Sequence, residues 1–261
     1  MSYFWFIYTG LFSLVLPFSE TSLGPYIFDP PPHVVFLVSE DPDNYNANQT
    51  IPSFAAQVKR ELGYEVTVLL GTGKQNAYEF PDFDKLKKAD VVVVFARRLA
   101  LPHKQMKLLR KYIKKGKPVV GIRTANHAFS VREGAIPPTH TDWWEFVPEV
   151  LGCENRGYGP VGPGIHVKVP RDTQKHPLVK DLVLDEWHSD GNLYLVAPLL
   201  DEKATILLEG ESDGKKEPIA WTRMAGRSRV FYTSLGYPKD FSDVQFQQLL
   251  LNGIQWALEE K

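Results

Sequence analysis

The chain has 261 residues, of which 43% are hydrophobic and 12% are aromatic. This is enough apolar material for one large domain with a sizeable core. Its 30 lysine and arginine residues and 31 acidic residues give a formal net charge of −1, with no long block of like charge. We therefore expect neither nucleic acid nor an anionic membrane surface as a partner.

The chain begins with an uncharged apolar run, residues 4–18, followed by small and polar residues up to position 24. The run is short for a membrane span but suits a signal peptide, although no lysine or arginine precedes it. We predict that residues 1–24 are a signal peptide or N-terminal anchor, with no stable membrane span elsewhere. The protein would then be periplasmic or secreted; if the run instead packs on the domain, it would be cytoplasmic. The proline-rich residues 25–32 are the predicted linker into a single domain, residues 33–261.

The first half of the domain alternates between apolar strands and amphipathic helices. The predicted strands are residues 33–38, 65–70, 90–95 and 118–122. The predicted helices are residues 50–62 and 101–115, which end at Gly63 and Gly116, with a short helix or turn at 82–88. Strands that are apolar throughout and alternate with helices predict right-handed βαβ units and a parallel sheet covered on both faces.

The pattern becomes less regular after residue 130. It predicts a short helix at 141–147, a loop at 157–164, strands at 166–169, 204–208, 219–222 and 229–233, and a long amphipathic helix at 244–258. The predicted fold class is α/β, with a mostly parallel central sheet and an irregular, β-rich second half.

A cluster of polar side chains follows the fourth predicted strand directly. In open α/β sheets, ligands bind at the carboxyl ends of parallel strands. His127 could transfer a proton near neutral pH, Arg123 could clamp an anion or a pair of vicinal oxygens, and Asn126 could donate to a developing oxyanion. The other interpretation is a buried polar network, including Thr124, that ties the sheet edge to the next loop.

Other candidate ligand contacts come from the loops around this edge. Glu40 and Tyr45 follow the first strand and Arg97 follows the third, so we expect them to bind substrate beside Thr124 and Asn126. The prolines in the loop at 157–164 exclude a P-loop. The loop could still form a lid over a sugar, with Tyr158 as a stacking surface.

Two further candidates are less constrained by the sequence. Trp143 could be a sugar platform, but adjacent helical residues point in different directions, so one residue of the pair Trp143-Trp144 should lie in the core. His188 could face the cleft. The seven histidines show no metal-ligand spacing, so we predict no metal and no cofactor. The single cysteine, Cys153, could be a free nucleophile, but no strand–turn–helix elbow surrounds it, which favours a small buried residue.

Four stretches of the chain resemble the trehalose-utilisation, or ThuA-like, family of the class I glutamine amidotransferase-like superfamily. They are the first strand with Ser39-Glu40, residues 101–125, Trp144-Glu145-Phe146 with Leu151-Gly152, and residues 226–236 followed by 246–258. The last stretch is the most specific. The resemblance implies a flavodoxin-like three-layer sandwich and a role in carbohydrate metabolism, as a glycosyl hydrolase or in keto-sugar processing, with a small carbohydrate as the ligand.

The resemblance also bears on catalysis. Amidotransferases of this superfamily carry a nucleophilic cysteine in the turn after the fourth strand. Arg123 and Thr124 occupy that turn here, so we do not expect a glutamine amidotransferase. Relatives often carry histidines after Leu151-Gly152 and after the later Leu-Gly pair, where this chain has residues 153–158 and Tyr237.

Two main hypotheses remain. The first is a sugar-active hydrolase or isomerase with His127 and Arg123 as catalytic residues. The second is a non-catalytic carbohydrate-binding or interaction module that kept the fold, which the missing histidines favour. A third, weaker hypothesis is an amidotransferase-like hydrolase that uses Cys153. The oligomeric state stays open, a homo-oligomer included.

Overall fold

The computed structural model describes residues 1, 30–180, 182–183 and 187–259. Residues 2–24 of the predicted signal peptide or anchor and residues 25–29 of the predicted linker lie outside the described residues. Pro31–Lys261 forms one compact unit. Within the part of the chain that is described, no helix has both the length and the apolar character needed to cross a membrane.

The long helices lie close to their predicted positions. They are α1 (Ala47–Leu62), α2 (His103–Lys114) and α3 (Val244–Leu258). Short helical segments are η1 (Phe83–Lys87), η2 (Arg123–His127), η3 (Phe146–Leu151) and η4 (Pro238–Ser242). The strands are β1 (His33–Ser39), β2 (Glu65–Lys74), β3 (Ala77–Glu79), β4 (Val91–Phe95), β5 (Leu101–Pro102), β6 (Val119–Ile122), β7 (His140–Thr141), β8 (Ile165–Lys168), β9 (His188–Ser189), β10 (Thr205–Ser212), β11 (Lys215–Ala225) and β12 (Ser228–Thr233).

One large sheet runs through the domain, with ten strands in the order β3-β2-β1-β4-β6-β12-β11-β10-β8-β9. Strands β2, β1, β4, β6 and β12 run parallel, which confirms the parallel sheet predicted for the first half. Strands β11, β10, β8 and β9 continue the sheet in antiparallel pairs and form the β-rich second half. The chain order reverses between β1 and β4, where such sheets leave a crevice for ligands outside the carboxyl edge.

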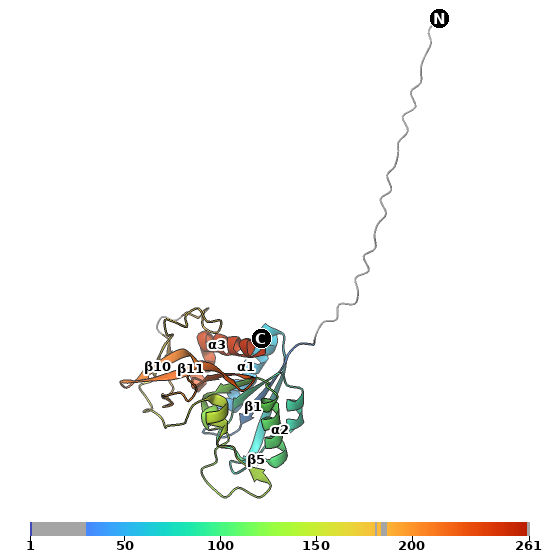
Figure 1. The fold of residues 1–261 in the computed structure, drawn as a ribbon, viewed down its shortest axis with the longest axis vertical. Coiled ribbons are helices and arrows are strands. Elements are labelled where there is room, and N and C mark those ends of the chain that lie inside the picture. Colours follow the sequence, from blue (N-terminus) through green and yellow to red (C-terminus); the bar gives the residue numbers. More distant parts are fainter. Residues whose placement is uncertain (2–29, 181, 184–186, 260–261) are drawn as a thin grey trace. The chain divides into compact units, whose positions relative to one another are not determined.

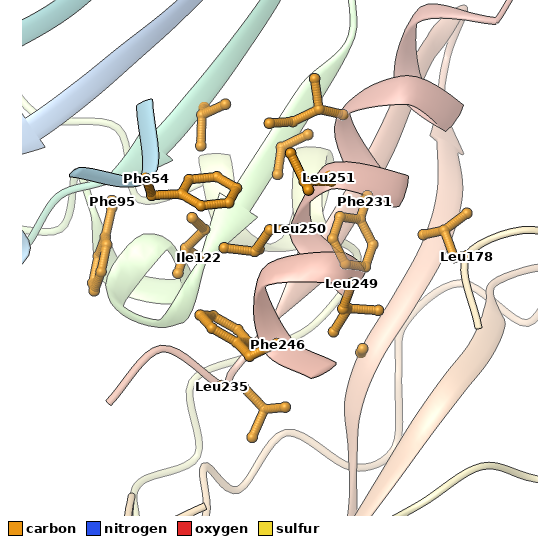
Figure 2. Packing of buried hydrophobic residues seen from close by; sticks show 14 of the residues in the cluster. Phe54, Phe95, Ile122, Leu178, Phe231, Leu235, Phe246, Leu249, Leu250 and Leu251 are labelled. Carbon is orange, nitrogen blue, oxygen red and sulfur yellow. The ribbon is translucent and has the colours of Figure 1, made fainter. Parts of the chain in front are cut away.

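Helices cover both faces of this sheet (Figure 1). Successive side chains of a strand point to opposite faces, so Phe36 of β1 packs in the cluster with α1 and α3, whereas Leu37 packs in the cluster with α2. Helix α3 buries an apolar stripe that includes Phe246 and Leu249 (Figure 2). Each large apolar side chain that is fully buried contributes about 1.5–3 kcal/mol, so this packing fixes the helix on the sheet.

The start of the second predicted helix is wrong by two residues. The sequence predicts a helix from Leu101, but Leu101 and Pro102 form β5 and pair with Thr141 and His140. Proline disfavours the α conformation in the residue before it, and Pro102 itself is extended, with φ −50° and ψ 140°. The helix therefore begins at His103.

The short helix predicted at residues 141–147 is also wrong. Thr141 lies in β7, and the helical segment η3 covers Phe146–Leu151 instead. The backbone N–H of Trp143 donates to the carbonyl oxygen of Phe129 at 2.7 Å. This long-range bond holds the segment in a non-helical path, which local sequence pattern could not predict.

Candidate functional site

The loops that follow β1, β4, β6 and β12 meet at the carboxyl edge of the parallel strands and enclose a pocket of about 490 Å³, here called the edge pocket. Its walls are Pro42, Asp43, Tyr45, Asn46, Arg97, Arg98, His127, Tyr158, Val161, Asn192, Tyr194, Tyr237 and Pro238. The volume is within the usual range for small-molecule sites. Its place beside the reversal of strand order is the one expected for a ligand site in this architecture.

Arg123 is buried and lies against residues of the pocket wall. It follows β6 directly, has a positive φ of 44°, and is completely buried. Its Nη1 donates to the carbonyl oxygen of Ser234 at 2.8 Å, and its Nη2 donates to Oδ1 of Asn192 at 2.7 Å. Arg123 is not among the residues that line the pocket. The structure therefore does not bring its guanidinium into the lining of this pocket, and its catalytic role stays a prediction.

The guanidinium of Arg123 also lies over aromatic rings of the pocket wall. Its Cζ is 4.1 Å from the ring centre of Tyr45, 4.7 Å from that of Tyr194 and 5.8 Å from that of Tyr237. Cation–π contacts are strongest when the cation is desolvated, as this one is. The hydrogen bonds and ring contacts together make Arg123 a positioning residue for the tyrosine-rich wall.

His127 lies at the end of η2 and lines the edge pocket, although its side chain is 3% exposed. Its Nδ1 is 2.5 Å from Oδ1 of Asn126. A proton on Nδ1 would be donated to this amide oxygen, and Nε2 would then be the unprotonated nitrogen. Nδ2 of Asn155 lies 3.0 Å from the same Nδ1 and donates to the hydroxyl of Tyr158 at 3.1 Å.

The surroundings of His127 keep its ring neutral. Burial lowers the pKa of the imidazole well below its usual value, and the positive charges of Arg98 and Arg97 lower it further, followed by those of Arg132 and Arg123. A neutral imidazole can accept a proton from a bound substrate at physiological pH.

The two arginines after β4 have different environments. Arg97 forms ion pairs with Asp41 at 3.1 Å and with Asp43 at 3.5 Å. Arg98 is 7% exposed and has a positive φ of 56°. Its Nη2 donates weakly to the hydroxyl of Tyr158 at 3.5 Å, and among the described residues its buried Nη1 has no hydrogen-bond partner.

Three other predicted site residues do not line the edge pocket. The Thr124 hydroxyl donates to Oδ1 of Asn44 at 2.5 Å, whose amide in turn donates to carbonyl oxygens at the ends of β1 and β4. Asn126 is fully buried and holds the ring of His127. For these two residues the buried-network interpretation describes the structure. Glu40 lines a neighbouring pocket of about 690 Å³ together with residues of β2.

Trp143 and His188 also lie away from the edge pocket. Trp143 is 6% exposed and packs against Phe146, with a ring-centre distance of 5.3 Å, so it is the core member of the tryptophan pair. His188 is exposed on β9, next to His166 and 3.9 Å from a carboxylate oxygen of Asp190. Neither position supports the predicted contact with a ligand in the edge pocket.

Of the residues predicted to bind substrate, Tyr45, Arg97 and Tyr158 do line the edge pocket, as does His127. The predicted set lacks Arg98, Asn192, Tyr194 and Tyr237, which also line it. Arg98 directly follows Arg97 in the sequence, so the same position after a buried strand that predicted Arg97 could also have predicted Arg98. Tyr194 reaches the site through a single bridge to Tyr158, which no local sequence pattern reveals.

Cys153 lies in the hydrophobic core on the α2 side of the sheet. It is fully buried, and burial raises the pKa of its thiol to about 12. The small-buried-residue interpretation is therefore confirmed. Across the described ranges, no group of three or more His, Cys, Asp or Glu side chains is arranged to hold a metal ion.

Two residues at positions that the sequence resemblance singled out lie near His127 and Arg123. Asn155 lies beside His127. Tyr237 lines the edge pocket, and the guanidinium of Arg123 lies over its ring.

Comparison with known proteins gives the same fold. A ThuA-like protein from Bacteroides uniformis ATCC 8492 matches with a TM-score of 0.64 at 16% identity, covering 91% of this chain and 96% of that one. A ThuA-like protein from Parabacteroides merdae ATCC 43184 matches with a TM-score of 0.62 at 18% identity, covering 87% of this chain and 90% of that one. At such identities the likeness concerns the fold alone.

No protein with a curated description matches the sequence. The family model described as trehalose utilisation, ThuA, matches residues 34–257, which is most of the chain. The protein therefore belongs to the ThuA, or trehalose utilisation, family.

Proposed function

We propose that this chain is an enzyme of sugar catabolism that binds a small carbohydrate in the edge pocket and uses His127 for proton transfer. The observation that carries the proposal is a neutral histidine in the wall of a pocket that Tyr45, Tyr158, Tyr194 and Tyr237 also line. Aromatic faces pack well against the apolar faces of sugar rings, and polar groups between them fix orientation. The family description, trehalose utilisation, favours a sugar over other small molecules.

The proposed chemistry is hydrolysis of a glycoside or processing of a keto sugar. In either case His127 would take a proton from a substrate hydroxyl, a carbon next to a carbonyl, or a water molecule. Asn126 contacts Nδ1 of the ring, so the direction of the imidazole is fixed. The tyrosine wall held by Arg123 would orient the sugar.

The first prediction concerns His127→Asn. Asparagine can keep a donor near the place of Nδ1, facing Asn126, while removing Nε2. We expect turnover of disaccharides or keto sugars, measured by product analysis, to fall by about 10²- to 10⁴-fold. The melting temperature should stay within a few degrees. The matched control is His166→Asn on the exposed face of β8, which should leave turnover unchanged.

The result also tests the alternative function. Unchanged turnover in His127→Asn would remove His127 from catalysis, and loss of the fold would favour a purely structural network. A non-catalytic carbohydrate-binding module is the second candidate, because His127 is nearly inaccessible and surrounded by arginines. Sugars that raise the melting temperature of the unmodified protein without any product would support that candidate.

A further inference from the structure

Arg98 is a buried cation without a counter-ion. Its side chain is 7% exposed, and among the described residues no carboxylate lies within ion-pair distance of it. Its neighbour Arg97, by contrast, is paired with Asp41 and Asp43. A buried charge is costly unless a charged or hydrogen-bonding partner compensates it. Among the described residues, the positive charge of Arg98 in the pocket wall thus has no carboxylate to neutralise it.

The backbone holds Arg98 in this position. A positive φ of 56° is uncommon for a residue with a long side chain and costs about 1 kcal/mol or more. The Arg98 N–H donates to the carbonyl oxygen of His127 at 2.9 Å, and the next N–H, that of Leu99, donates to Ala128 at 2.6 Å. These bonds fasten the loop after β4 to the end of η2, so Arg98 and His127 are placed as a unit.

The groups around Arg98 are suited to a ligand with acceptor oxygens. The Tyr158 hydroxyl lies 3.5 Å from Arg98 Nη2 and 3.5 Å from His127 Nδ1. The contact with Arg98 is long for a hydrogen bond, and Nη1 has no partner among the described residues. Among the described residues that line the pocket, Asp43 is the only acidic one, and it is exposed and paired with Arg97.

We propose that the ligand of the edge pocket carries an anionic group, a carboxylate or a phosphate, that binds Arg98 beside His127. The proposal rests on the function proposed above and gives it a substrate class: a sugar acid or a sugar phosphate. A guanidinium matches two oxygens of such a group with two parallel N–H bonds, and Tyr158 can add a third donor. The tyrosine wall would then hold the sugar ring. Positive charge from Arg97 and Arg132 also acts on Arg98 and would favour an anion.

The test is calorimetric titration of the full chain with matched sugars. Glucose, galactose and mannose are compared with the corresponding uronates and 6-phosphates, and the two anionic sets separate carboxylate from phosphate recognition. We expect at least one anionic sugar to bind tenfold or more tightly than its neutral counterpart. In Arg98→Gln the ratio between the affinities for the anionic and the neutral sugar should fall to about one.

Controls make each outcome decisive. Arg227→Gln removes an exposed arginine far along the chain and should leave the preference intact. Arg98→Lys keeps the charge but loses the paired donors, so the preference should fall severalfold; it serves if Arg98→Gln does not fold. Neutral sugars that bind as tightly as anionic ones, or an unchanged preference in Arg98→Gln, would overturn the inference and leave the proposed function standing. Absence of binding by any sugar would overturn both.

Discussion

Arg123 follows β6 directly, where the resemblance to class I glutamine amidotransferases would place a nucleophile, yet it has no access to the edge pocket. Its planar guanidinium instead joins Ser234, Asn192 and the tyrosine wall. The side chain in the turn after β6 thus has a structural role. A lysine could not reproduce this set of contacts, because its ammonium group is a point charge and lacks the planar guanidinium with two N–H donor groups.

We therefore predict that Arg123→Lys destabilises the protein. One of the two side-chain hydrogen bonds would be lost, along with the stacking on Tyr45. Loss of a hydrogen bond to a charged group lowers the free energy of unfolding by about 1–3 kcal/mol. Urea denaturation measures the change, and Arg227→Lys at an exposed position should stay within about 0.5 kcal/mol. Ligand affinity should also fall, since the tyrosine wall loses its support. Equal stability of the two variants would contradict the positioning role.

The neighbours Arg97 and Arg98 show the limit of sequence reasoning at this scale. The position after a buried parallel strand predicts that side chains here face a ligand, and both line the edge pocket. Which one is neutralised depends on Asp41 and Asp43, which follow β1 and are far away in sequence. A local pattern contains no information about such a pairing.

At the scale of elements, predictions succeeded where periodicity alone decides the structure. Helix α3 has the predicted bounds because its apolar stripe repeats regularly over the whole length. The segment at residues 141–147 failed because its conformation depends on a bond from Trp143 to Phe129. The same dependence on distant partners kept Tyr194 and Asn192 out of the predicted site.

Helix α3 approaches the sheet closely at Gly253. A Cβ at this position would collide with the ring of Phe231 on β12, which is fully buried beneath the helix (Figure 2). Glycine in a helix interior lowers stability by about 1 kcal/mol relative to alanine. Here its lack of a side chain allows the helix to pack closely against Phe231.

We predict that Gly253→Ala destabilises the protein by about 1–3 kcal/mol, because overpacking outweighs the gain in helix propensity. Chemical denaturation followed by circular dichroism measures the change. Gln255→Ala, two residues along on the exposed side of the same helix, is the control and should lie within about 0.5 kcal/mol of the parent. An increase in stability for Gly253→Ala would show that helix and sheet lie further apart than described.

At the scale of the whole molecule, β12 joins the two halves of the sheet. It pairs parallel with β6 on one side and antiparallel with β11 on the other. The hydrophobic cluster on the α2 face extends across this junction and contains Leu37 of β1, Trp221 of β11 and Cys153. Because the cluster is shared, we expect the parallel and antiparallel halves to unfold together.

The single thiol gives a direct test of this cooperativity. Cys153 is fully buried and its pKa is raised to about 12 by that burial, so it should react with a disulfide reagent at least about a thousandfold more slowly in native protein than in denaturant. With increasing urea, exposure of the thiol should follow the loss of circular dichroism in one common transition. Labelling that precedes the loss of secondary structure would show that the cluster opens separately from the sheet. Rapid labelling in native buffer would instead return Cys153 to the list of candidate nucleophiles.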